Sequence, residues 1–168
     1  MGKHKDKLAS FELALRDAGI AFCNLVCVSS IIPPNCKVLP KDEGLKLLKP
    51  GQITYIVMSR IDTNEPNRLI AAAVGLAIPQ DPTTYGYLAE HTAYGQTDEK
   101  AGDYAEDLAA SMLASTLGAE FSVEDSYDTK QEIWRISGKL VRTRHIVQSA
   151  EGDKNGLWTT AIAAVILV

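Results

Sequence analysis

The sequence TDEKAGDYAEDLAASMLASTLG (residues 97–118) carries the strongest helix signal in the chain. Thr97 or Asp98 can cap its start, the acidic residues of its first turn favour the helix dipole, and Gly118 is a natural C-terminal stop. Helical spacing of apolar and small residues predicts a buried stripe. This stripe comprises Ala101, Tyr104, Ala105, Leu108, Met112, Thr116 and Leu117. We therefore expect a long helix that packs on the protein core.

Segments with strand character lie on both sides of this helix. Strands are predicted over GQITYIVMSR (51–60), TYGYLAEHTAYG (84–95), EIWRISGKLV (132–141) and LWTTAIAAVILV (157–168). The segment NRLIAAAVGLAIPQD (67–81) is ambiguous, because its alanines suit a helix whereas its length and closing proline suit a strand. We favour a strand.

The N-terminal part adds a shorter helix and another strand. Apolar residues recur at helical spacing over residues 8–18, and Gly19 then ends the helix. AFCNLVCV (21–28) has strand character, and the prolines at 33 and 34 limit it. A helix, several strands, a long helix and further strands form an α+β pattern, in which helices cover a mixed sheet. We expect one domain over residues 1–168.

Composition narrows the range of functions. The 168 residues are 46% hydrophobic and carry a formal net charge of −4, with acidic and basic residues dispersed. This distribution disfavours nucleic-acid binding and favours a small ligand. The polar start MGKHKDK (1–7) is not a secretory signal, and the apolar run at the C-terminus is too short to cross a membrane. We therefore expect a cytoplasmic protein with no membrane partner.

The cysteines and histidines do not form a metal-binding pattern. Cys23, Cys27 and Cys36 include no CxxC pair, and the three histidines are isolated from them and from one another. An odd number of cysteines in a chain of this kind also argues against a disulfide framework. We expect neither a metal site nor disulfides.

Two adjacent hydroxyls interrupt the apolar segment NLVCVSSIIPPNCKVLP (24–40). Serine pairs of this kind are usually turn or capping residues. No catalytic histidine and aspartate accompany Ser29 and Ser30, no GxSxG motif surrounds Ser30, and no glycine-rich phosphate loop is present. A triad hydrolase or a nucleotide-dependent enzyme is therefore not favoured.

Three polar residues stand out elsewhere. Strand alternation places Glu90 on the same face as Leu88, where it is either a solvated residue at a strand end or a buried proton donor. Glu12 follows Phe11 on the first helix and is, on its own, an ordinary solvated carboxylate. Asn24 lies within an apolar strand, where burial would require a hydrogen-bond partner.

Four segments together resemble the family of pyruvoyl-dependent arginine decarboxylases. They are FELALRDAGI (11–20), NLVCVSSIIPP (24–34), AAAVGLAIPQD (71–81) and GYLAEHTAYG (86–95), in this order and at these separations. The most diagnostic feature is Ser-Ser-Ile-Ile-Pro-Pro with an asparagine six residues before the second serine. The resemblance covers nearly the whole chain and implies a layered sandwich of mixed or antiparallel sheets covered by helices.

The resemblance implies self-cleavage between Ser29 and Ser30. Ser29 becomes the C-terminus of a chain 1–29, and Ser30 becomes a pyruvoyl group at the start of a chain 30–168. This group forms a Schiff base with the substrate amine and takes up the electron pair as carbon dioxide leaves. No metal and no pyridoxal phosphate are required. The implied reaction converts L-arginine to agmatine and carbon dioxide.

The resemblance implies, by position in the family motifs, that Glu90 is the acid that protonates the substrate carbon and that Asn24 takes part in processing and organises the active site. By the same match of positions, the resemblance implies that Glu12 contacts the substrate guanidinium. The family usually has Asp at position 12, and the longer Glu leaves another basic amino acid open as the substrate. A non-catalytic, uncleaved binding relative is the alternative from another class.

The separation of Asn24 from Ser30 leaves two alternatives: either the chain doubles back, or the partner of Asn24 is on another subunit. Six residues of extended strand span roughly 20 Å, which is too far for a hydrogen bond within one straight strand. The resemblance implies a homotrimer of cleaved protomers, or a higher assembly, with active sites between subunits. Family members also usually carry a strand before the first helix, so the short start of this chain predicts an exposed sheet edge.

Overall fold

The computed structural model describes residues 1–118 and 141–168. Within these residues the chain forms a first sheet with strand order β1-β8-β4-β2, a second sheet with order β3-β6-β5-β7, and three helices. The elements are β1 (Gly2–His4), α1 (Lys7–Ala18), β2 (Asn24–Cys27), β3 (Ile31–Ile32), α2 (Lys41–Leu45), β4 (Ile53–Thr63), β5 (Leu69–Pro79), β6 (Gly86–Tyr94), α3 (Asp98–Leu117), β7 (Val141–Glu151) and β8 (Trp158–Leu167).

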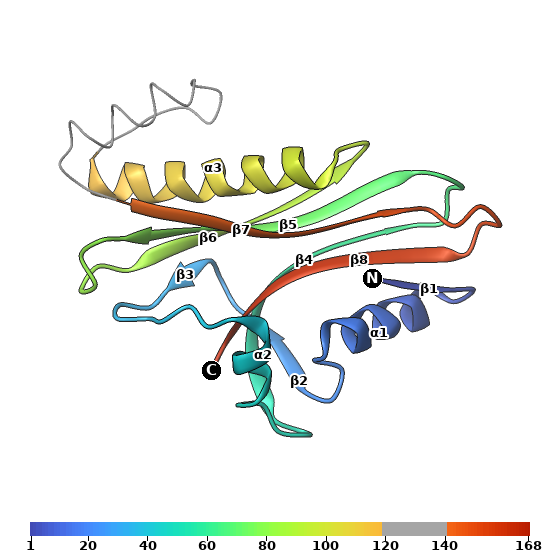
Figure 1. Ribbon diagram of the computed structural model, residues 1–168, viewed down its shortest axis with the longest axis horizontal. Helices are drawn as coiled ribbons and strands as arrows, with labels where there is room; N and C mark the ends of the chain where they lie inside the picture. Colours follow the sequence, from blue (N-terminus) through green and yellow to red (C-terminus); the bar gives the residue numbers. More distant parts are fainter. Residues whose placement is uncertain (119–140) are drawn as a thin grey trace.

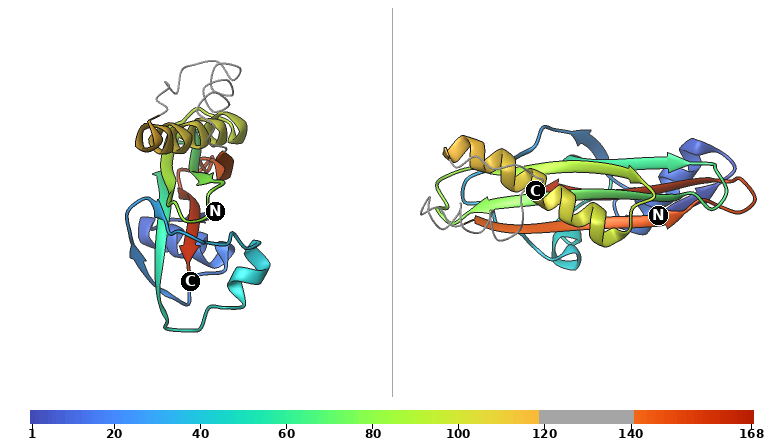
Figure 2. Two further views of the ribbon diagram at one scale, coloured as in Figure 1. Left: turned by 90° about the vertical axis from the view of Figure 1, so that its left-hand side faces the viewer. Right: turned by 90° about the horizontal axis from the view of Figure 1, so that it is seen from above.

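The two sheets lie face to face and helices cover their outer sides (Figure 1). Helix α3 packs on β5, β6 and β7 of the second sheet, and α1 packs on β1 and β8 of the first. Figure 2 shows α1 and α3 on opposite sides of the pair of sheets. The predicted α+β layered sandwich is confirmed. Among the described helices, none has the length and apolar character needed to span a membrane.

The ambiguous segment is strand β5, and its alternation explains its alanines. Ile70 and Val74 point into the core between the sheets, where they pack with β4 and β8. The opposite face of β5 carries Ala71 and Ala73, which lie under α3. Gly75 continues this face, and a Cβ there would lie 2.0 Å from the main-chain oxygen of Ala105. Small residues are therefore required because the helix lies almost directly on the strand.

This close packing corrects the predicted stripe of α3. Ala101 and Ala105 are buried as expected, but Tyr104 is 44% exposed and stacks on His91. Thr116 is exposed, while Leu108, Met112 and Leu117 pack only at the margin. The rest of the buried face consists of Gly102, Ala109, Ala110, Leu113 and Ala114. The helix turns its small residues toward β5, because larger side chains would hold it away from the strand.

Thr97, Gly19 and Gly118 act as the predicted caps, and Asp6 provides a cap at the start of α1 that was not predicted. Asp6 accepts a hydrogen bond from the backbone of Ala9 at the start of α1, and Thr97 from that of Lys100 at the start of α3. Gly19 and Gly118 adopt the left-handed conformation at the C-terminal ends, with φ of 83° and 71°. The strands predicted around β2, β4, β6 and β8 are also confirmed. The strand predicted over residues 132–141 lies, apart from Val141, outside the described residues.

The short start of the chain predicted an exposed sheet edge, and this prediction is wrong for the edge of β8 that pairs with β1. Residues Gly2 to His4 form β1, which pairs antiparallel with β8 in register with Thr160, Thr159 and Trp158. A strand of three residues is enough to cover this part of β8. Because β1 is so short, the outer edge that it presents in turn is also short.

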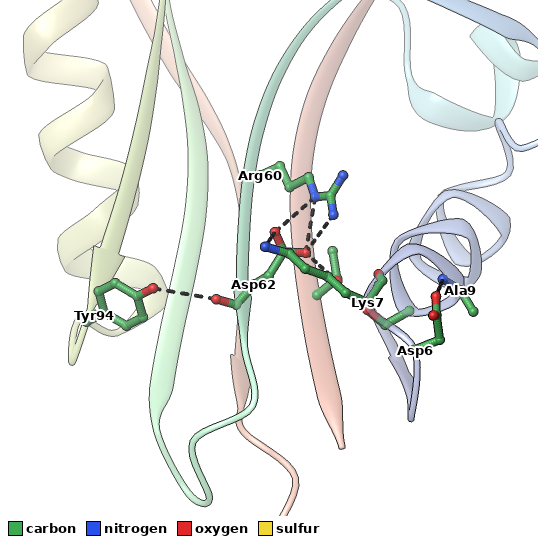
Figure 3. A network of polar contacts seen from close by, with 8 residues as sticks. Asp6, Lys7, Ala9, Arg60, Asp62 and Tyr94 are labelled. Carbon is green, nitrogen blue, oxygen red and sulfur yellow. Dashed lines mark hydrogen bonds and ion pairs between the residues drawn. The ribbon is translucent and has the colours of Figure 1, made fainter. Parts of the chain in front are cut away.

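A partly buried polar network ties α1 to the first sheet (Figure 3). Asp62 on β4 accepts hydrogen bonds from Arg60 Nη2 at 2.9 Å and from Thr160 Oγ1 at 2.7 Å. Lys7 on α1 lies 3.6 Å from the Asp62 carboxylate, and Ser10 on α1 bonds Thr160 at 2.7 Å. Burial alone would raise the pKa of Asp62, but the hydrogen bonds from Arg60 and Thr160 outweigh it and hold the pKa below its ordinary value.

We expect Asp62→Asn to lower stability at neutral pH, because the amide loses the charge-assisted bonds to Arg60. The loss is about 2 kcal/mol, which corresponds to about 5 °C in the thermal midpoint. A pKa lowered by folding stabilises the protein above the unfolded pKa, and this contribution is lost as the pH falls through the folded pKa. Thermal melts at pH 7 and pH 3 should therefore show a gap between wild type and variant that narrows in acid. Asp42→Asn, on the exposed surface of α2, is the control and should show no gap.

Candidate active site

The serine pair lies where the chain passes from one sheet to the other. β2 is an edge strand of the first sheet, and β3 is an edge strand of the second. Ser29 and Ser30 are the two residues between Val28, which still bonds to β4, and the start of β3. Figure 1 shows this crossing between the ends of β2 and β3. The two hydroxyls therefore lie in a connection that links the two sheets.

Pairing of β3 with β6 brings Ser30 to Glu90. The register places Ile31 opposite Tyr87 and Ile32 opposite Gly86, and the Leu88 N–H donates to the Ser30 carbonyl at 2.8 Å. The Ser30 hydroxyl donates to Glu90 Oε2 at 3.3 Å. Two residues that are sixty positions apart in the sequence are thus in direct contact.

The alternation predicted for β6 is present, and it places Glu90 in solvent. Leu88 is fully buried in the core between the sheets, whereas Glu90, two residues further on the same face, is exposed. The sequence left two alternatives for Glu90, a solvated residue at a strand end or a buried proton donor. Within a single chain Glu90 is the solvated residue. The half-buried Ser30 is its hydrogen-bond partner.

Asn24 does not contact Ser30 in its own chain. Its backbone N–H donates to the Gln52 carbonyl at 2.8 Å, and its side-chain amide donates to the Gly51 carbonyl at 2.9 Å. It is exposed, so it is not the buried amide that the apolar strand suggested. These bonds hold it at the end of β2 that is remote from the serine pair.

Glu12 also lies apart from Ser30 and Glu90. It is on α1, which packs on β1 and β8, whereas Ser30 and Glu90 lie on the second sheet and its connection. The Glu12 carboxylate is 44% exposed and accepts a hydrogen bond from Arg16 Nε at 2.5 Å. A single chain therefore joins Ser30 with Glu90 and leaves Asn24 and Glu12 at other places on the surface.

The comparisons with known proteins agree on one family. A family model described as pyruvoyl-dependent arginine decarboxylase matches residues 1–168. A protein from Chloroherpeton thalassium, named a probable pyruvoyl-dependent arginine decarboxylase, is 60% identical over all of this chain and 92% of its own length. Pyruvoyl-dependent arginine decarboxylase 2 of Methanosarcina mazei is 54% identical over 99% of this chain and 91% of its own. The chain belongs to the pyruvoyl-dependent arginine decarboxylase family. The family resemblance of the sequence motifs is confirmed.

The serine pair fits the cofactor of this family. A pyruvoyl group is formed from a serine residue at the start of a chain, so it needs a serine in a connection that can be opened. Ser30 meets this requirement, because it lies between two sheet edges and its hydroxyl faces a carboxylate at 3.3 Å. The Leu88 N–H holds the Ser30 carbonyl on β6, so residue 30 has an anchor that does not depend on Ser29.

Sequence patterns did not reveal an exposed apolar strip beside Asn24. Parallel pairing of β2 with β4 places Asn24 beside Ile53 and Val26 beside Tyr55, on one face. Val26, Ile53 and Tyr55 are 41%, 66% and 53% exposed. On β4 this is the face that carries Val57 into the core, so the strip continues the core beyond the cover of the second sheet. The sequence did carry a signal for this strip, because apolar residues occupy this face of both strands: Val26 in β2, and Ile53 and Tyr55 in β4.

Other features of the described residues do not add to this site. No group of three or more His, Cys, Asp or Glu side chains in residues 1–118 and 141–168 is arranged to hold a metal ion. The three cysteines are free. A cavity of about 540 Å³ lies among α1, α2, β7 and β8, and its lining includes none of Glu12, Asn24, Ser30 and Glu90.

Proposed function

We propose that this pyruvoyl-dependent arginine decarboxylase relative cuts its own chain between Ser29 and Ser30 and then converts L-arginine to agmatine and carbon dioxide. The observation that carries the proposal is the hydrogen bond from the Ser30 hydroxyl to Glu90. It gives the hydroxyl that must attack the Ser29 carbonyl a base at hydrogen-bond distance. The names of the family and of the relatives support arginine as the substrate.

Glu90 has two successive tasks in this proposal. In the intact chain it accepts the proton of the Ser30 hydroxyl. In the cleaved protein its side chain lies beside residue 30 and can supply a proton to the substrate carbon. The pyruvoyl group at residue 30 supplies an electron-accepting ketone for the loss of carbon dioxide. Ser29 ends the shorter chain, which remains in the fold through β1, α1 and β2.

A second copy of the chain completes the site, and we place it on the apolar strip formed by Val26, Ile53 and Tyr55. The strip continues the face of the core, and its side chains are exposed in the described part of a single chain. Asn24 lies in the same strip, remote from its own Ser30, so packing of copies carries it to a neighbouring serine pair. This arrangement accounts for an asparagine that does not contact the serine pair of its own chain. A homotrimer, with Glu12 turned toward the site of a neighbour, is our proposed assembly.

Intact mass spectrometry of the purified chain tests the cleavage. Fragments 1–29 and 30–168, the larger lighter by one ammonia than simple hydrolysis gives, would establish the pyruvoyl group at residue 30. A mass that stays at the full 168 residues after prolonged incubation would overturn the proposal in favour of an uncleaved binding protein. Carbon dioxide release from arginine, ornithine, lysine and histidine then identifies the substrate. Activity on another amino acid but not on arginine would contradict the substrate assignment.

Arg16 should compete with a cationic substrate for Glu12, because its guanidinium already occupies that carboxylate. A pair of this kind, four residues apart on an exposed helix, is worth about 0.3–0.5 kcal/mol. Arg16→Gln should therefore lower KM for arginine about two-fold and leave kcat unchanged, as measured by initial rates of carbon dioxide release. Arg16→Lys keeps the charge and should behave like the wild type. An unchanged KM in Arg16→Gln would show that Glu12 does not bind the guanidinium.

A further inference from the structure

The carbonyl of the bond between Ser29 and Ser30 has a main-chain donor. The Ile31 N–H donates to the Ser29 oxygen at 3.0 Å, which closes a three-residue turn with Ser30 at its centre. Ser30 is not among the described residues with positive φ, so the turn is the inverse γ-turn, which is common at strand ends. No other donor to this oxygen is present in the described part of the chain.

Strand register leaves the Ile31 N–H free for this bond. The Leu88 N–H donates to the Ser30 carbonyl, and Ile31 is opposite Tyr87 at the next position. In an antiparallel pair such positions alternate, so the N–H of Ile31 points away from β6. β3 is the edge of its sheet, so no described strand lies on that outer side. Position 33, two residues further along, also faces outward, but it is a proline and has no N–H. Ile31, in contrast, has an N–H that can donate.

We propose that the main-chain N–H of Ile31 stabilises the oxyanion that forms on the Ser29 carbonyl during self-cleavage. The inference rests on the proposed function, because it concerns the same bond. The Ser30 oxygen forms a bond to the Ser29 carbonyl carbon, the π electrons move to the Ser29 oxygen, and the hydroxyl proton passes to Glu90. An electron pair of the oxyanion then re-forms the carbon–oxygen double bond as the carbon–nitrogen bond breaks, the electron pair of the broken bond goes to the Ser30 nitrogen, and the proton passes from Glu90 to that nitrogen. The product is an ester between Ser29 and the Ser30 side chain.

The geometry of the turn suits this step. A donor 3.0 Å from the carbonyl oxygen lies in the range of effective oxyanion donors, and the bond shortens as negative charge develops. The donor is already in place in the intact chain, so it requires no reorganisation when the hydroxyl attacks. The Ser29 carbonyl and the Ile31 N–H are connected along the chain through residue 30 alone. Breaking the bond between Ser29 and Ser30 therefore opens the turn and releases the Ser29 carboxylate from Ile31.

The first test compares Ile31→Pro with Ile31→Ala in the full chain. Proline removes the N–H, and it does so at an outward-facing position of an edge strand, where proline is tolerated. Alanine removes most of the side chain and keeps the N–H. We expect Ile31→Pro to cleave at least about 100-fold more slowly than wild type, as reported for the loss of one oxyanion donor. Ile31→Ala should cleave at a rate close to that of the wild type. The readout is the fraction of intact 168-residue chain over time by mass spectrometry.

A second pair of variants tests the Ile31 N–H without proline, because a proline ring also restricts the backbone of the residue before it. The α-hydroxy analogue of isoleucine at position 31 replaces the N–H by an ester oxygen and keeps the side chain. The matched control is the α-hydroxy analogue of valine at position 28, which removes the 3.0 Å bond from the Val28 N–H to Ile56 on the other side of the serine pair. Each ester also weakens the carbonyl before it as an acceptor, and at position 31 this is the Ser30 carbonyl that the Leu88 N–H bonds at 2.8 Å. Ile31→Pro keeps an amide carbonyl there, so the proline and ester tests complement each other.

Slow cleavage with the ester at 31 and normal cleavage with the ester at 28 would support the proposal. Cleavage at equal rates in the two ester variants, whether both fast or both slow, would overturn it, even if Ile31→Pro is slow. These outcomes are distinct from failure of the proposed function, in which the wild-type chain itself is not cut between Ser29 and Ser30.

Discussion

Ser30→Ala is expected to leave the chain at its full length of 168 residues and to abolish arginine decarboxylation. The variant lacks the hydroxyl that attacks the Ser29 carbonyl, and an alanine at position 30 cannot give rise to a pyruvoyl group. The loss should be complete within detection, because both cleavage and the electron-accepting ketone depend on this one side chain. Intact mass and carbon dioxide release from arginine, measured on the same sample, check both parts.

Ser29→Ala is the matched control for this prediction. It removes the neighbouring hydroxyl but keeps the Ser29 carbonyl position, the turn closed by Ile31 and the contact of Ser30 with Glu90. The hydroxyl of residue 29 forms no bond in the proposed step, so this variant should still be cut and remain active. If Ser30→Ala is still cleaved, or if cleavage is lost in Ser29→Ala instead, the attacking hydroxyl does not belong to Ser30.

Glu90→Gln should reduce kcat for arginine by about 10²–10⁴-fold, the range for loss of a positioned acid or base. Glutamine keeps the size of the side chain and can still meet the Ser30 hydroxyl, but it neither takes up nor releases a proton at neutral pH. Cleavage of the chain should also be slowed, because the hydroxyl of Ser30 loses its base. The two effects are separated by measuring the cleaved fraction by mass and expressing carbon dioxide release per cleaved chain.

Glu65→Gln is the control for the loss of a surface carboxylate. Glu65 is exposed, and its ion pair is a 3.7 Å contact with Arg68, away from the serine pair. This variant should retain normal cleavage and normal kcat. A Glu90→Gln protein that is fully cleaved and has a wild-type kcat would remove Glu90 from both steps and leave only its structural contact with Ser30.

Local patterns in the sequence were sufficient for the helices. The Thr97 cap and the glycines at 19 and 118 act within a few residues, so they were recognised without help from distant parts of the chain; the Asp6 cap is equally local but was not predicted. The buried face of α3 was predicted less well. Periodicity marked apolar residues such as Leu108 and Met112, but the approach of the helix to Gly75 of β5 decided that alanines face the sheet.

The candidate site divides in the same way. The serine pair, Glu90, Asn24 and Glu12 were all identified from motifs, because a motif records which residue types occur and at what spacing. Their relative positions were not available from spacing. The contact of Ser30 with Glu90 depends on the register of β3 and β6, and a shift by one residue would turn these side chains to opposite faces. Asn24, in contrast, does not reach Ser30, because pairing of β2 with β4 holds its side chain at the Gly51 carbonyl.

The sequence by itself determined the α+β order of elements, the ends of the two long helices, the serine pair and the family. All of these depend on interactions or identities that are local along the chain. Only the tertiary structure decided that Ser30 meets Glu90, that Ile31 donates to the Ser29 carbonyl, and that the strip beside Asn24 is exposed. The physical reason is that sheet register and the crossing between sheets join residues far apart in sequence, and these pairings are set by packing of the whole domain.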